Sequence, residues 1–222
     1  MVRRRVKEEE VEEERLSVYK VPQVDFDTVF EVQLIPETII LGCGKNKKRL
    51  EYYVSKGVID PEEGKHLDRY FYRDSEGNPI ILKHHLIAVI RRACKALGFN
   101  EEIASQFDIV EPMRVGSRVV LVPKNYIVVR GKPLIDRSPV LIKDRRGERS
   151  STITYEYLDP VVHKDAIKFY LATNLKGEDL VKFLTALEFG GKAVGLYRGL
   201  SRGFGRFKVV YRDVTEEIKK LS

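Results

Sequence analysis

The chain has 222 residues, of which 43% are hydrophobic, so it is long enough to bury a sizeable core as one domain. Its 40 Lys and Arg residues outnumber its 33 Asp and Glu residues, and the resulting net charge of +7 favours an anionic partner. No apolar run approaches the roughly 18 residues of a membrane span, and the charged N-terminus does not resemble a secretory signal. We therefore expect a cytoplasmic protein with no membrane partner.

The cysteines and the short motifs exclude several common kinds of enzyme. Cys43 and Cys94 are far apart in the sequence and match no metal-ligand spacing, so we expect two reduced thiols. The sequence contains no HExxH, CxxC, GxSxG or Walker motif. Metalloproteases, zinc sites, Ser hydrolases and P-loop NTPases therefore have no support.

The N-terminal half is predicted to contain a charged arm, a strand and an insertion. Residues 1–17 join a basic cluster to acidic repeats, which is typical of a solvated arm, and residues 18–222 are expected to form a single RRM-like domain. Apolar residues alternate across Val24–Leu34, which predicts the first strand, and the glycine-bearing segment Ile39–Gly44 follows it. The insertion is expected over residues 45–72, which are lysine-rich, lack a clean period and look partly helical.

A turn and an amphipathic helix follow the insertion. Arg73–Pro79 (RDSEGNP) is a strong turn signal. Lys83–Leu97 has apolar residues at helical spacing, which predicts a helix, and Gly98 is a natural stop signal. A second, polar face of this helix carries His84, Arg91 and Lys95. This face is interpreted either as part of an RNA groove or as an ordinary solvated surface.

The C-terminal half is predicted to hold strands, a projecting hairpin and two helices. Residues 130–158, here called the thumb, are highly charged up to Ser151, so we expect a hairpin that projects from the core. Further strands are expected at Val119–Val122, Tyr126–Val129, Ala166–Thr173 and Arg206–Tyr211. Helices are expected at Gly177–Phe189 and Thr215–Ser222.

A glycine-rich segment, residues 188–211, leads into the last of these strands. It holds six of the 16 glycines, with Arg198, Arg202 and Arg206 between them. Glycine allows positive φ and close approach of a ligand to the backbone, so this combination suits a phosphate backbone. The plainer interpretation is a tight turn into an edge strand, for which one or two glycines are enough.

The order of these elements predicts an α+β fold. It is the plan of a ferredoxin-like or RRM-like antiparallel sheet with helices on one face, an insertion after the first strand and a projecting thumb hairpin. The open face of such a sheet commonly binds RNA.

Four segments together resemble the RAMP superfamily, the RNA-binding proteins of CRISPR systems. The FGG and SRGFGRFKV runs of the glycine-rich segment are close to the family's C-terminal glycine-rich loop. Ile40–Lys45 (ILGCGK) resembles the family's glycine-bearing segment, and Leu67–Gly98 resembles its entry to the first helix. Ile135–Leu158 resembles the thumb hairpin of the family, with Glu156 on the returning strand. Within the helix entry the matching positions are Asp68, Arg73–Asp74, Gly77–Pro79, Ile81 and Leu86–Arg91. The resemblance spans most of residues 24–212.

The closest variety of the family is the backbone subunit that repeats along the guide RNA in type III effector complexes. The resemblance implies a guide-RNA-binding subunit of a ribonucleoprotein complex. Its partners would be guide RNA, complementary target RNA, further copies of itself and other effector subunits. The thumb of such subunits wedges between nucleotides of the guide–target duplex. Binding is expected to be largely independent of sequence, because one protein must hold any guide.

Asp68 is the catalytic and metal-binding residue that the resemblance implies. In type III backbone subunits the aspartate at this position helps to cleave bound target RNA with a divalent cation, so Mg²⁺ or a similar ion is the expected cofactor. The plainer interpretation is a surface carboxylate paired with Arg69 or Arg73.

Two segments depart from the family pattern, and one of them is the segment between Gly44 and Asp68, which is longer and more charged than usual. The family has Gly-Ser-Ser-Leu-Lys-Gly where this chain has Lys83–Ala88 (KHHLIA), so bulky histidines replace small residues that admit a phosphate. Histidine titrates near neutrality, which leaves open a standalone repeat-RNA endoribonuclease that uses His84 or His85. A non-catalytic RNA-binding structural subunit is the remaining alternative.

The predicted RNA contacts come from the insertion and helix, from the thumb and from the glycine-rich segment. They are Lys45, His84, Arg91 and Lys95; Arg137, Lys143, Arg145, Arg146 and Arg149; and Arg198, Gly199, Arg202, Gly203, Gly205 and Arg206. Tyr155 and Tyr157 share one face of a strand, where stacking on bases and inward packing both remain open.

Overall fold

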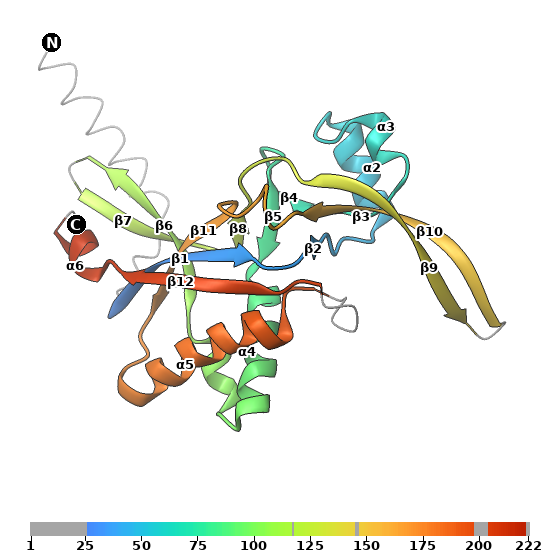
Figure 1. Ribbon diagram of the computed structural model, residues 1–222. Helices are drawn as coiled ribbons and strands as arrows, with labels where there is room; N and C mark the ends of the chain where they lie inside the picture. The colour runs from blue at the N-terminus through green and yellow to red at the C-terminus, as the bar shows by residue number, and fades with distance from the viewer. Residues whose placement is uncertain (1–25, 117, 145–146, 198–203, 221–222) are drawn as a thin grey trace, which may run out of the picture.

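The computed structural model describes residues 26–116, 118–144, 147–197 and 204–220 (Figure 1). Its centre is a five-stranded antiparallel sheet in the order β12-β1-β11-β6-β7. The strands are β1 (Thr28–Pro36), β6 (Asp108–Val115), β7 (Arg118–Lys124), β11 (Ile167–Thr173) and β12 (Phe207–Asp213). Helices α4 (Lys83–Leu97) and α5 (Gly177–Phe189) lie together on one face of the sheet (Figure 1). The predicted α+β, ferredoxin-like class is confirmed.

Alternating burial explains how the sheet and the helices share a core. Phe30, Val32 and Leu34 of β1 are buried in one cluster with Leu86 of α4 and Phe183 of α5. A smaller cluster gathers Val29, Val110, Ala172, Val214 and Ile218, the last from α6 (Thr215–Lys219). The sheet therefore carries its main core on the helix side and a minor one elsewhere.

Helix α4 has the bounds that its apolar spacing predicts. It ends at Gly98, whose φ of 72° is left-handed, a conformation that glycine adopts without the steric cost of a Cβ. Leu86, Val89 and Ile90 are buried, so its apolar face packs against the sheet. None of the helices in the described part of the chain is long and apolar enough to cross a membrane.

The region predicted as the insertion folds around a small core of its own. It contains α2 (Lys47–Ser55), α3 (Pro61–Gly64) and β3 (Leu67–Arg69). The side chains of Asn46 and Asp60 cap the two helices by accepting backbone N–H groups. The shared buried residues are Leu50, Tyr53, Ile59, Leu67 and Tyr70.

The thumb is a long antiparallel hairpin of β9 (Leu134–Asp144) and β10 (Gly147–Leu158), which extends away from the central sheet (Figure 1). At its base β10 also pairs with β2 (Ile40–Leu41), antiparallel, and with β3, parallel. Thr154, Glu156 and Leu158 are buried there, whereas Tyr155 and Tyr157 on the other face are half-buried. The two tyrosine rings lie 5.9 Å apart.

A third sheet joins β4 (Tyr72–Arg73), β5 (Pro79–Leu82) and β8 (Tyr126–Val128). The predicted turn Arg73–Pro79 lies between its first two strands. The predicted strands at Val119–Val122 and Tyr126–Val129 are both present as β7 and β8. They belong to different sheets, however, because β7 pairs with β6 and β8 pairs with β5.

Three elements that the sequence did not predict are a strand and two short helical turns. Strand β6 (DIVEPMRV) contains Pro112 and charged residues on its exposed side, so its apolar alternation is broken. Helix α5 continues into a π-helical turn, Gly190–Val194, at the start of the glycine-rich segment. A short 3₁₀ helix, Glu101–Ser105, follows α4.

Candidate nucleic-acid interface

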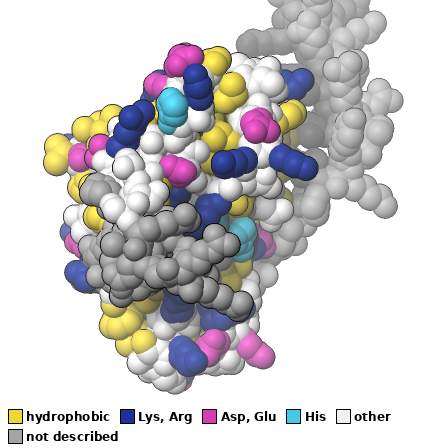
Figure 2. Space-filling view, turned by 90° about the vertical axis from the view of Figure 1, so that its right-hand side faces the viewer, with side chains coloured by type: hydrophobic (Ala, Val, Ile, Leu, Met, Phe, Trp, Pro, Cys, Tyr) yellow, Lys and Arg dark blue, Asp and Glu magenta, His cyan; other side chains and the backbone are white. Residues whose placement is uncertain are grey.

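Two adjoining pockets form a trough between the base of the thumb and α4. The α4 pocket has a volume of about 340 Å³, and the thumb-base pocket has a volume of about 290 Å³. Lys45 and Arg69 line both of them. Figure 2, which views the molecule from the thumb side, shows Lys and Arg side chains spread over this face among acidic ones.

The α4 pocket is built from segments far apart in the sequence. His85, Ala88 and Arg92 line it from one face of α4, because residues three or four apart in a helix are neighbours. The other lining residues come from the segment after β2, from β3 and β4, and from the glycine-rich segment. They are Gly42, Cys43, Lys45, Arg69, Tyr72, Val89, Gly195 and Tyr197.

Glycines let the walls of this pocket pack closely. A Cβ on Gly42 would lie 2.5 Å from the backbone carbon of Tyr70. Gly195 has a φ of 72°, and a Cβ there would lie 2.7 Å from the carbonyl oxygen of Gly205. Both glycines therefore hold backbone against backbone.

The thumb-base pocket lies where β3 meets the returning thumb strand. Its lining residues are Lys45, Lys47, Leu50, Leu67, Asp68, Arg69, Tyr70, Ser151, Thr152 and Ile153. Together the two pockets present four cations, Lys45, Lys47, Arg69 and Arg92, against one carboxylate, Asp68. Such a surplus of positive charge suits a polyanion.

Asp68 is exposed, and its role at the thumb base is partly structural. Its Oδ2 accepts a hydrogen bond of 2.8 Å from the Thr154 N–H, across the parallel β3–β10 pairing. The ion pair with Arg69 or Arg73 that the plainer interpretation requires is not formed among the described residues. Its Oδ1 makes no hydrogen bond to a described residue.

Arg73 pairs instead with Glu156 of the thumb. Both side chains are buried, and Glu156 Oε2 also accepts a 2.8 Å hydrogen bond from the Phe71 N–H. Burial raises the pKa of Glu156, while the nearby Arg73 guanidinium and the Phe71 N–H lower it. The glutamate singled out on the returning strand thus fixes the thumb to the domain.

His85 points into a buried polar cluster. Its Nε2 lies 3.7 Å from Cys43 Sγ, and its ring packs edge-on against Tyr197 with centroids 4.8 Å apart. Burial, together with the neighbouring His84, lowers the pKa of His85 to about 4, and burial raises the pKa of Cys43 to about 11. At neutral pH the imidazole is uncharged and the thiol is protonated. This imidazole is therefore a poor general acid.

The polar face predicted for α4 is exposed but lies beside the trough. His84, Arg91 and Lys95 are all exposed, yet they line neither pocket. Arg92 lines the trough instead, together with Arg69, and neither was singled out as a site residue. Arg92 follows His85 by seven residues, a helical spacing that the sequence does contain.

Part of the predicted contact set falls outside the described residues. These are Arg145, Arg146, Arg198, Gly199, Arg202 and Gly203. The side chains of Lys143 and Arg149 are likewise not described, and the predicted arm at residues 1–17 is not described either. Among the described members, Lys45 and Arg137 are exposed.

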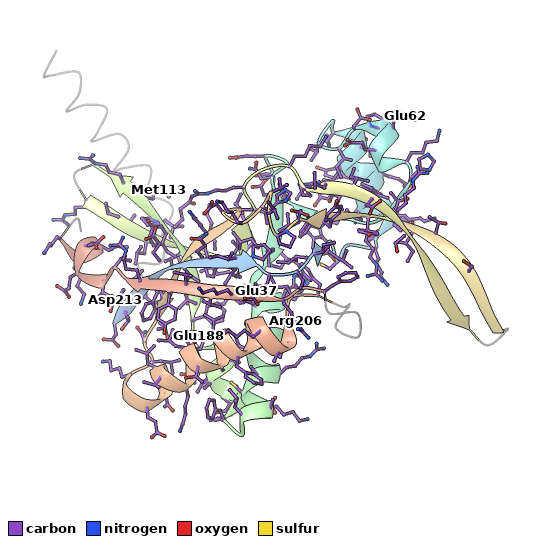
Figure 3. The ribbon with its side chains drawn as sticks, viewed as in Figure 1. Glu37, Glu62, Met113, Glu188, Arg206 and Asp213 are labelled. Carbon is purple, nitrogen blue, oxygen red and sulfur yellow. The ribbon has the colours of Figure 1, made fainter. Side chains whose placement is uncertain are left out.

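Arg206 is exposed just before β12. Its carbonyl accepts a 2.9 Å hydrogen bond from the Glu37 N–H, which places the two residues side by side (Figure 3). Gly205, with a φ of 85°, packs against the Leu196 carbonyl. The start of the last strand is thus fixed by backbone contacts.

The side chains around Asp68 determine whether this site could hold the expected divalent cation. No group of three or more His, Cys, Asp or Glu side chains in the described ranges is arranged to hold a metal ion. Asp68 shares its pocket with Lys45, Lys47 and Arg69. Since Mg²⁺ prefers several oxygen ligands, it would need phosphate oxygens of a bound RNA in addition to this carboxylate.

Comparison with known proteins yields distant likenesses of shape. No family model matches the chain, and no curated protein matches it. A chain of the solved "Cryo-EM structure of the Type III-B Cmr-beta bound to cognate target RNA" is 12% identical with a TM-score of 0.49; the match covers 92% of this chain and 66% of that one. A chain of the "Type IV-B CRISPR Complex" is 13% identical with a TM-score of 0.40, and the match covers 84% and 90% of the two chains. Likenesses this weak carry no argument about function.

Proposed function

We propose that this chain is a guide-RNA-binding backbone subunit of a CRISPR ribonucleoprotein effector complex. One observation carries the proposal: the four segments that resemble the RAMP superfamily meet at the trough. Ile40–Lys45, Leu67–Gly98, Ile135–Leu158 and residues 188–211 each contribute lining residues to one or both pockets. Segments so distant in sequence converge on one basic surface, which is where a shared ligand would bind.

The charge of the trough favours contacts to phosphates. Its cations come from a loop, a helix, a short strand and α4. Phosphate contacts position a strand without reading its sequence. The bound RNA is therefore held largely independently of sequence, with further copies of this chain and other subunits along the same guide.

The proposal is tested with the full chain and fluorescently labelled single-stranded RNAs of unrelated sequence. Lys45→Ala and Arg69→Ala should weaken binding to all of them to a similar extent. Each lost phosphate contact should also reduce the slope of log K against log salt concentration by about 0.7. Arg118→Ala, an exposed arginine on β7 away from the trough, is the matched control. Binding that depends strongly on one sequence, or that ignores both substitutions, would contradict the proposal.

Cleavage of the bound target at Asp68 is the finer part of the proposal. Support comes from the resemblance and from the place of Asp68 in the basic trough, where its Oδ1 makes no hydrogen bond to a described residue. A divalent cation held between this carboxylate and RNA phosphates would neutralise charge at the cleaved phosphate. The chain itself supplies the carboxylate, the surrounding cations and the thumb strand that fixes the position of Asp68 through Thr154.

The test reconstitutes the assembly with guide and complementary RNA. Regular cuts that require Mg²⁺ should disappear in Asp68→Asn, which retains a side-chain oxygen for the Thr154 N–H, while RNA binding persists. If the target RNA stays intact in the wild-type assembly, the proposed cleavage at Asp68 is wrong, and the RNA-binding role stands. Cleavage of hairpin RNA in EDTA that His84→Ala or His85→Ala abolishes would instead select the repeat-RNA endoribonuclease.

A further inference from the structure

The α4 pocket contains a buried polar atom without a partner. His85 Nδ1 is buried and makes no hydrogen bond to a described residue, while the buried Tyr197 hydroxyl has the Cys43 thiol beside it. A buried polar group without a hydrogen bond is costly, so such an atom in a native protein calls for a partner supplied by a ligand or a water molecule. Tyr197 is also the one non-glycine residue with positive φ, 65°, in the described part of the chain. Strain of this kind gathers at ligand sites.

The same pocket offers aromatic faces to a flat ligand. The rings of Tyr72 and His85 are within 13° of parallel, with centroids 6.4 Å apart. This distance is about twice the ~3.4 Å step between stacked bases. A pocket of about 340 Å³ lies in the lower part of the range of roughly 300–1,000 Å³ that is typical of small-ligand sites.

Cations lie beside these aromatic groups. Lys45, Arg69 and Arg92 line the pocket; Lys45 and Arg92 are exposed and Arg69 is half-buried. The guanidinium of Arg49 also lies 4.9 Å from the centre of the Tyr72 ring. Aromatic faces with neighbouring cations form the combination by which proteins hold single-stranded nucleic acid, with bases stacked and phosphates paired.

We propose that the α4 pocket receives one unstacked base of the bound RNA strand. The base lies against Tyr72 and His85, its polar edge pairs with His85 Nδ1, and the flanking phosphates contact Lys45, Arg69 and Arg92. The inference rests on the proposed RNA binding and adds to it a single-nucleotide subsite within the trough. It also gives a role to the bulky KHHLIA segment, whose His85 supplies a surface for a base where small residues would admit a phosphate.

The experiment combines a plugged pocket with a missing base. Ala88 is exposed and lines the pocket, so Ala88→Leu fills its opening without changing the core, and Ala96→Leu makes the same change at an exposed position of α4 outside the pocket. Short unstructured RNAs with one abasic site, moved along the strand, are titrated against the full chain. At one position the abasic site should weaken binding to wild type and to Ala96→Leu on the order of ten-fold. In Ala88→Leu the same abasic site should cause no further loss of RNA affinity.

A second measurement follows the base directly. 2-Aminopurine placed at the sensitive position should lose fluorescence on binding to wild type and to Ala96→Leu, because it stacks on the rings, and should keep it with Ala88→Leu. Two results would overturn the subsite and leave the proposed RNA binding intact. One is tight binding whose affinity no abasic site changes; the other is a loss of affinity at an abasic site that is equal in all three proteins. Absence of any RNA binding by the wild type overturns both.

Discussion

The two halves of the trough are built in different ways. The thumb-base pocket lies on β3 and β10, whose relative position is fixed by strand pairing, by the Asp68–Thr154 hydrogen bond and by the buried pair of Arg73 and Glu156. The α4 pocket is bounded by two glycine-bearing segments and a helix face, and His85 Nδ1 in it makes no hydrogen bond to a described residue. Paired strands and a buried ion pair suit a rigid support, whereas an open pocket lined by a helix face suits a ligand.

The largest expected effect comes from removing the buried pair of Arg73 and Glu156, which supports the base of the thumb. Glu156→Ala leaves the Arg73 guanidinium buried without its carboxylate, which should lower the free energy of unfolding by about 3–5 kcal/mol. Denaturant unfolding of the full chain measures it. Thr152→Ala, at an exposed position of the same strand, should change little. An equal loss in both variants would mean that the Arg73–Glu156 pair does not fix the thumb.

A smaller effect is expected at the wall of the α4 pocket. Gly195 and Gly57 have φ values of 72° and 70°, but a Cβ meets the Gly205 backbone only at Gly195, since nothing lies within 4 Å at Gly57. Gly57→Ala should cost about 1–2 kcal/mol for its backbone conformation. Gly195→Ala should cost roughly 1–3 kcal/mol more, because the added methyl group overpacks the wall. Equal unfolding free energies for the two variants would show that the Gly205 backbone moves to accommodate the added methyl group.

The smallest expected effect is a pH dependence that originates in the α4 pocket. The pKa of His85 falls from 6.5 to about 4 on folding, so the unfolded chain binds the proton more tightly. The contribution of His85 to the free energy of unfolding is fully present above pH 6.5 and is lost as the pH falls toward 4. Unfolding measured across this range should show a smaller decline in His85→Gln than in wild type. His84→Gln should retain most of it, because burial is the larger cause of the shift.

Local patterns predicted the elements that local interactions determine. The spacing of Leu86, Val89 and Ile90 with a glycine stop was sufficient to define α4, and the charged hairpin was apparent from its composition. Strand β6 could not be found in the same way, because Pro112 and the charged residues near it break its apolar alternation. Its identity as a strand follows from pairing with β11 and β7, which the sequence of the segment does not express.

The candidate site depends more on long-range placement. Arg73 and Glu156 are 83 residues apart, and sequence spacing gives no sign that they meet. Arg69 and Arg92 likewise join the trough only because β3 and α4 fold beside the segment after β2. By contrast, Asp68 and Lys45 were singled out through the family resemblance, and both line the trough.

The pairing of β10 with three partners has a consequence for how the hairpin can vary. Its base is held by β2, β3 and β9 at once, whereas its outer part pairs with β9 alone. Because side chains alternate with a period of two, the outer part can gain or lose residues in matched pairs without turning Tyr155 and Tyr157 to the other face. The reach of the hairpin is therefore an adjustable length, set independently of the surface at its root.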